Sequence, residues 1–231
     1  MYKENVGQYF DAKRMAARRL LGKSGSRQLR FRPQGLPSNG EIQEALLELA
    51  VLTEGHTRLA RLFAMRVVAL ETMRALASFR PRLIGSVRSG HVRRGSDIDL
   101  HVFTDDLEPL ECYLHGLGWA YDVREVTIQK DGKPVDYTHV YVEDVFPVEL
   151  SVYPRMELRR TARSSTDGKP IVRLRATALV ELIRREHPSD WAHYEATGEV
   201  RDLDVFLDEA PLLTLAEVEA LAEEEEDPRP L

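Results

Sequence analysis

The chain of 231 residues has 43% hydrophobic and 30% charged side chains, which is typical of a globular protein rather than of a disordered or fibrous one. No apolar run approaches the ~20 residues that a membrane-spanning helix needs, and residues 1–10 lack the apolar core of a secretory signal, so we expect no membrane partner. The single cysteine, Cys112, excludes an internal disulfide and a cysteine-built zinc site, and it favours a cytoplasmic location.

Charge is distributed unevenly along the chain, whose formal net charge is −6. Residues 1–40 carry nine Lys and Arg against two acidic residues, and residues 199–231 carry twelve Asp and Glu against two Arg. The two ends either attract each other, bind a partner such as another protein, or are ordinary solvated faces. The charge pattern alone leaves these three alternatives open.

Helical patterns dominate the N-terminal part of the chain. Residues 2–22 predict a basic helix, and residues 23–40, rich in Gly, Ser, Pro and Arg, predict a loop. Ser38 followed by Glu41 is a capping box, which predicts the start of a helix. Apolar residues at helical spacing then continue to Leu76, and Pro81 ends this stretch. Gly55 either splits the stretch into two helices or weakens a single one.

The middle of the chain changes to the period of β-strands. Short apolar or alternating runs predict strands at 83–84, 97–103, 121–129, 135–142 and 146–153. We expect a short helix at 107–117 that carries Cys112 in its buried side, and a hairpin turn at Asp131-Gly132. Further helices are expected at 177–187, from Ser189 or Asp190 onward, and after Thr214.

This order of elements predicts an α/β (α+β) fold, in which helices flank a mixed β-sheet and helical extensions stand at both ends. We divide the chain into a basic N-terminal extension (1–37), a core (38–155), and a mostly helical C-terminal region with an acidic tail (156–231).

Asp97 and Asp99 are the first candidates for chemistry. Residues two apart on a strand face the same side, so these carboxylates lie side by side while Ile98 and Leu100 face the core. Two carboxylates that close repel each other and raise one pKa, and a bound Mg²⁺ or Mn²⁺ ion removes this repulsion. The alternative is an exposed edge strand whose acids are solvated.

Gly85-Ser86 stands at the end of the preceding strand, and ten residues separate it from Asp97. Glycine lets a phosphate approach the backbone, and free amides with the Ser86 hydroxyl can hold phosphate oxygens. Three cations of the following loop can offset the charge of a triphosphate; they are Arg88, Arg93 and Arg94. Ser96 either binds a phosphate or starts the strand, and His91 is a further residue of this loop that could touch a phosphate.

Glu149 is the third candidate acid, since it lies inside the otherwise apolar run 146–152. A carboxylate in an apolar strand is costly unless it is paired or binds a metal, although an edge position facing water is the alternative. If its strand lies beside the Asp97–Asp99 strand, three carboxylates can hold divalent ions, and Glu149 can act as the base. Asp136 and Glu143 are the alternatives for this role.

The residues Ile84-Gly85-Ser86, Asp97-Ile98-Asp99-Leu100 and the later Glu149 resemble the signature of the DNA polymerase β-type nucleotidyltransferase superfamily. The run GSVRSGHVRRGSDIDL is especially similar to minimal nucleotidyltransferases and small adenylyltransferases. The resemblance covers about residues 80–155, and it implies that the core 38–155 is a nucleotidyltransferase catalytic core. It implies a Mg²⁺-dependent (or Mn²⁺-dependent) transfer of NMP from an NTP such as ATP, with release of pyrophosphate. The implied site residues are Asp97, Asp99 and Glu149 for catalysis and metal binding, and Gly85, Ser86, Arg88 and Ser96 for the nucleotide.

Other features leave the acceptor and the alternatives open. The acceptor is a small molecule, a protein side chain or an RNA end, and the net charge favours a non-polymer acceptor over RNA. The Arg-rich segment 155–175 either binds phosphates or is a solvated surface. His101 either lines the site or packs in the fold. The alternative functions are a non-catalytic, regulatory or antitoxin-like binding module of the same fold, and a nucleic-acid-binding protein.

Overall fold

A computed structural model describes residues 9–21, 36–130, 133–161, 163–164 and 169–206. Contacts within the chain divide it into two compact units, residues 54–209 and residues 1–53 with 210–231. The division into segments 1–37, 38–155 and 156–231 stays a prediction. The hairpin turn expected at Asp131-Gly132 and the helix expected after Thr214 lie outside the described residues.

Two helices are described in the N-terminal part, α1 (Tyr9–Leu21) and α2 (Asn39–Ala75). The predicted capping box is confirmed, because the Glu41 amide donates to Ser38 Oγ at 3.1 Å and the Ser38 amide donates to Glu41 Oε2 at 2.7 Å. Gly55 interrupts α2 with a φ of 51° and a ψ of −123°. Glycine adopts a positive φ without a steric cost, so the sequence feature marks a kink in this helix.

The sheet is mixed and has five strands in the order β1-β2-β5-β4-β3. β2 runs parallel to β5, while the other neighbouring pairs are antiparallel. This confirms the predicted mixed sheet with flanking helices, and each strand lies within a few residues of its expected position. The strands are β1 (Arg82–Leu83), β2 (Ile98–Phe103), β3 (Tyr121–Lys130), β4 (Lys133–Val142) and β5 (Val148–Tyr153).

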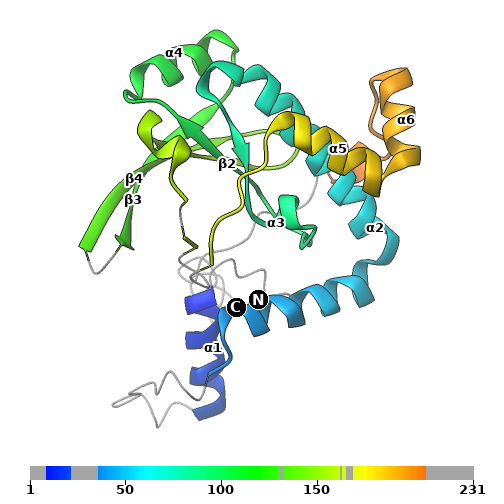
Figure 1. The fold of residues 1–231 in the computed structure, drawn as a ribbon. Coiled ribbons are helices and arrows are strands. Elements are labelled where there is room, and N and C mark those ends of the chain that lie inside the picture. The colour runs from blue at the N-terminus through cyan, green and yellow to red at the C-terminus, as the bar shows by residue number, and fades with distance from the viewer. Residues whose placement is uncertain (1–8, 22–35, 131–132, 162, 165–168, 207–231) are drawn as a thin grey trace, which may run out of the picture. The chain divides into compact units, whose positions relative to one another are not determined.

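The remaining helices are short. α3 (Gly85–Ser89) lies between β1 and β2, and α4 (Glu108–Gly116) follows β2 (Figure 1). α5 (Ala176–Glu186) and α6 (Pro188–Thr197) come after the sheet. Three 3₁₀ turns complete the description: Ala77–Phe79, Arg155–Arg159 and Leu203–Phe206. Among all the residues that the structure describes, no helix combines the length and apolar character needed to span a bilayer.

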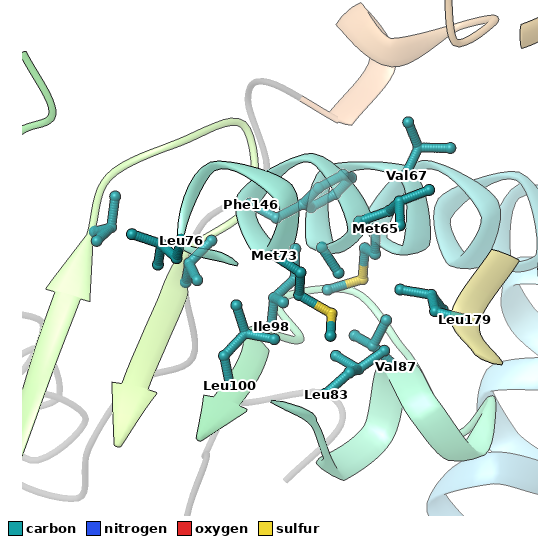
Figure 2. Packing of buried hydrophobic residues seen from close by; sticks show 14 of the residues in the cluster. Met65, Val67, Met73, Leu76, Leu83, Val87, Ile98, Leu100, Phe146 and Leu179 are labelled. Atoms are coloured by element: carbon teal, nitrogen blue, oxygen red, sulfur yellow. The ribbon is translucent and has the colours of Figure 1, made fainter. Parts of the chain in front are cut away.

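One face of the sheet packs against helices and forms the core. Alternation along β2 sends Ile98 and Leu100 to this face, where they meet Met65 and Met73 of α2 and Leu179 of α5 (Figure 2). All five side chains are fully buried or nearly so. Since the core residues of β2 are the even-numbered ones, Asp99 and His101 must face the opposite side of the sheet.

The expectation that Cys112 belongs to the core is wrong, because its side chain is exposed. The buried stripe of α4 consists of Leu110 and Leu114, four residues apart and therefore one above the other. Cys112 stands midway between them in sequence, and the helical repeat of 3.6 residues turns it to the other side of the helix.

Candidate active site

The three acids predicted to share a site lie together at one end of two neighbouring strands. Asp97 immediately precedes β2, Asp99 belongs to β2, and Glu149 of β5 is the direct register partner of Asp99. Each of the three can offer a carboxylate oxygen such that these oxygens all lie within 4.8 Å of one another. Asp136 and Glu143, the alternatives for the third acid, are both exposed on or after β4 and lie outside this group.

The electrostatics of this cluster are unfavourable without a cation. Burial, together with the charges of Asp97 and Glu149, holds the pKa of Asp99 well above its usual range. Burial and the charge of Glu149 also raise the pKa of Asp97, against the opposing effects of a backbone hydrogen bond and of the Arg93 charge. The donor set consists of carboxylate oxygens only, which Mg²⁺ and Mn²⁺ prefer, so the residues present suit such an ion.

Gly85 packs directly against the Asp99 carboxylate. Its φ is +65°, and a Cβ at this position would stand 2.0 Å from Asp99 Oδ2. The preceding amide, of Ile84, donates to the Asp99 carbonyl at 3.0 Å. The Gly85-Ser86 pair is thereby fixed against the acids, with no room for a side chain between them.

Ser86 and Arg88 stand on the short helix α3 with their side chains partly exposed. Neither the Ser86 hydroxyl nor the Arg88 guanidinium has a polar partner in the part of the chain that the structure describes. The Ser86 carbonyl accepts the amides of Gly90 and His91 at 2.8 and 3.0 Å. Within the described residues both side chains are therefore open to a ligand, while the backbone that carries them is tied down.

Ser96 lies in a buried turn rather than on the open side of the loop. Its Oγ accepts the Arg93 amide at 3.0 Å, and its own amide donates to the Arg93 carbonyl at 3.0 Å. This turn leads the chain into Asp97. A role of Ser96 in binding the nucleotide stays a prediction.

α2 holds the loop between Gly85 and Asp97 in place. The sequence interpretation treated the α2 residues that do so only as parts of a helix. Arg58 donates to the Gly90 carbonyl at 2.8 Å, and the buried Arg66 donates from Nε to the Val87 carbonyl at 3.2 Å. Glu54 accepts the Arg94 amide at 3.0 Å and pairs with Arg61. The one signal for these contacts in the sequence was a charge, Arg66, inside the apolar run 64–70.

β4 contributes two residues beside Glu149 that the sequence interpretation also missed. His139 Nδ1 lies 2.7 Å from Glu149 Oε1, and Tyr141 is the register partner of Glu149. Burial, followed by the charge of Glu149, raises the pKa of Tyr141. Strict alternation of His139 and Tyr141 along β4 was visible in the sequence, but the pairing of β4 with β5 was not.

Further along the same face, His101 is packed rather than free. Arg173 Nε donates to His101 Nδ1 at 3.0 Å, and the guanidinium lies over the rings of Phe103 and Tyr153 at 5.1 and 5.4 Å. Burial and the nearby Arg173 charge lower the pKa of His101 to about 3, so its ring is neutral. Arg173 of the Arg-rich segment 155–175 thus holds the fold together at this point.

No protein-family model and no curated protein matches the chain. Among solved structures, a cytoplasmic RNA terminal U-transferase shares 22% identity over 41% of this chain and 29% of its own, with a TM-score of 0.28. Cid1 in complex with the UTP analogue UMPNPP shares 17% identity over 52% of this chain and 38% of its own, with a TM-score of 0.31. The matched part is thus well under half of either structure. Similarity at such TM-scores carries no argument about function, so the function is inferred from the site alone.

Proposed function

We propose that the chain is a nucleotidyltransferase that transfers NMP from an NTP to an acceptor and releases pyrophosphate. The observation that carries the proposal is the group of three carboxylates, Asp97, Asp99 and Glu149, with oxygens within 4.8 Å of one another. The close packing of Gly85 against Asp99 puts the Gly-Ser backbone at the same place. Carboxylates beside a glycine-containing turn are suited to binding a nucleoside triphosphate together with its divalent cation.

Each residue has a role that follows from its placement. The three carboxylates would hold Mg²⁺ or Mn²⁺, which would neutralise phosphate charge and make the acceptor hydroxyl more acidic. The Ser86 hydroxyl and the Arg88 guanidinium, both without protein partners in the described part, would bind phosphate oxygens. Glu149 would accept the proton of the acceptor hydroxyl.

The reaction balances with these groups alone. The acceptor oxygen forms a bond to the α-phosphorus, and the bond from that phosphorus to the bridging oxygen breaks. Pyrophosphate leaves with the electron pair of that bond, and the hydroxyl proton passes to Glu149. No oxidant, reductant or further co-reactant is needed.

The acceptor is a separate part of the proposal. We keep a non-polymer acceptor ahead of an RNA end, because the formal net charge of −6 opposes a polyanionic partner. Arg159 and Arg160 are exposed beside the end of β5, although Arg160 pairs with Glu157 at 3.1 Å. Together with the exposed Arg163, these side chains are the cations through which RNA would be held if it is the acceptor.

The test uses the full chain with Mg²⁺ and each α-labelled NTP in turn, with cell extract supplying acceptors. We expect label in one acceptor fraction, and release of pyrophosphate, that depend on both the extract and the ion. Separation of the products into small molecules, protein and RNA identifies the acceptor class. If the Asp97→Asn and Asp99→Asn variants label acceptors as strongly as the unmodified chain does, the proposal is contradicted. Binding of NTP without transfer would favour the non-catalytic module.

A further inference from the structure

β4 surrounds Glu149 with groups that can donate hydrogen bonds. Antiparallel pairing places Tyr141 directly opposite Glu149 and His139 opposite Ser151. Because the side chains of directly opposed residues share a face, these residues and Glu149 all lie on the acid side of the sheet. Ser151 Oγ also reaches Glu149 Oε1, at 3.5 Å, which is the outer limit for a hydrogen bond.

His139 approaches the Glu149 carboxylate more closely than Ser151 does. Its Nδ1 lies 2.7 Å from Glu149 Oε1, with side chains that are 11% and 20% exposed. The pair stands at ion-pair distance without the alignment of a hydrogen bond, and within the described residues that buried nitrogen has no aligned partner. At this distance, a rotation of the ring that points the Nδ1–H at the carboxylate would complete a hydrogen bond.

Glu149 differs in this respect from the two aspartates. Asp99 is buried beside the negative charges of Asp97 and Glu149, and among the described residues no side-chain donor acts on it. Carboxylates that repel each other turn apart if their side chains can rotate. A glutamate has one more rotatable bond than an aspartate, so it needs an outside contact to stay turned toward the other acids.

We propose that His139 is a positioning residue that holds the Glu149 carboxylate toward Asp97 and Asp99 through its Nδ1–H. This role rests on the proposed function, since its purpose is to keep the third acid ready for a divalent cation. Partners of this kind behind a metal-binding residue are generally needed for full affinity, and their loss costs about 10–100-fold in metal affinity or activity.

The test compares two substitutions of nearly the same shape. His139→Asn places an amide N–H where Nδ1 stands, while His139→Leu places a methyl group there. We expect calorimetric titration with Mn²⁺, without any NTP, to show binding about 10–100-fold weaker in the Leu variant. The Asn variant should bind Mn²⁺ within a few-fold of the unmodified chain.

Two controls separate this role from a structural one. His115→Leu removes an exposed imidazole of α4 and should leave Mn²⁺ affinity unchanged. Thermal unfolding and nitrogen NMR of His139 in the unmodified chain report folding and the Nδ1–H···Oε1 hydrogen bond independently of activity. Equal Mn²⁺ affinity in folded Leu and Asn variants, or a His139 Nδ1 that carries no proton, would overturn the role of His139 alone. Failure of the unmodified chain to bind Mn²⁺ would overturn the proposed function as well.

Discussion

The carboxylate of Asp99 occupies the space that a side chain at Gly85 would need, since a Cβ there would stand 2.0 Å from Asp99 Oδ2. β1 and β2 are antiparallel neighbours, and the Ile84 amide is bonded to the Asp99 carbonyl at 3.0 Å. The sheet therefore brings the Gly-Ser turn onto the acids through backbone pairing. The absence of a side chain at Gly85 is therefore what allows the Asp99 carboxylate to lie where it does.

Gly85→Ala should damage this contact more than an ordinary glycine substitution does. The added methyl group must displace the Asp99 carboxylate, and its backbone must keep a φ of +65°. We expect a loss of about 1–3 kcal/mol in the free energy of unfolding, as for other strained backbone positions. Loss of Mn²⁺ binding should accompany it, and chemical unfolding and calorimetry measure the two effects.

Gly118→Ala is the matched control for Gly85→Ala. Gly118 also has a positive φ, +71°, but a Cβ there would meet no atom of the described residues within 4 Å. This variant should lose stability through backbone strain alone and keep its affinity for Mn²⁺. If Gly85→Ala binds Mn²⁺ as tightly as Gly118→Ala does, Asp99 has no place in a cation site.

Much of the fold could be predicted because its signals are local. The capping box of Ser38 and Glu41, the alternation from Asp97 to Phe103, and the apolar run around Glu149 are each contained in a few neighbouring residues. The mixed sheet followed from the order of these elements. That Asp99 faces Glu149 was conditional on the two strands being neighbours, which the pairing of β2 with β5 fulfils.

Contacts between residues far apart in the chain had no such signal. His139 and Tyr141 alternate on β4, but only the register with β5 brings them to Glu149. Arg66 reaches Glu186 at 2.7 Å across 120 residues, and no spacing rule links these positions. Cys112 shows the opposite error, because nearby leucines made it look buried when the helix turns it outward.

Asp99→Asn should stabilise the chain at neutral pH in the absence of divalent ions. Burial and two neighbouring carboxylates raise the pKa of Asp99 in the fold, so ionisation of this group opposes folding. The contribution of Asp99 to stability is therefore fully present below its usual pKa of 3.8 and is lost as the pH rises through the raised value. Urea unfolding at pH 4 and pH 7.5 should show the Asn variant gaining relative stability only at the higher pH.

Addition of Mg²⁺ should reverse the order of these two proteins. The ion stabilises the unmodified chain by binding only its folded state, while Asp99→Asn loses a ligand and gains nothing. Asp106→Asn, at an exposed position after β2, should behave as the unmodified chain in both conditions. An Asp99→Asn variant that Mg²⁺ stabilises as much as it does the unmodified chain would exclude Asp99 from the site.

Glu149→Gln should bind NTP but transfer slowly. The amide keeps the shape of the side chain and loses both its charge and its ability to accept a proton, and the loss of general-base catalysis is worth about 10²–10⁴-fold in rate. Single-turnover kinetics with a bound labelled NTP measure this step. Glu143→Gln, an exposed acid after β4, is the control and should retain full activity. A large loss in Glu143→Gln with none in Glu149→Gln would move the third acid to Glu143.

His187 should make the stability of the chain depend on pH below about pH 6.5 through its contact with Arg66. Arg66 Nη1 lies 3.2 Å from His187 Nε2, so this nitrogen accepts and the ring is neutral. Burial first, then the Arg66 charge, lowers the pKa of His187 below its ordinary value of 6.5. The unfolded chain therefore binds a proton that the folded chain does not bind, and stability falls as the pH drops below about 6.5, by at most about 1.4 kcal/mol per pH unit.

His187→Gln keeps an acceptor near the Nε2 position and should flatten this dependence, whereas the exposed His115→Gln should not. Because Arg66 also donates to the Val87 carbonyl of α3, the protection of the amides at 87–90 against hydrogen exchange, relative to their intrinsic rates, should fall as the pH drops in the unmodified chain and stay level in His187→Gln. Identical slopes of stability against pH in His187→Gln and in the unmodified chain would show that His187 carries its charge in the fold.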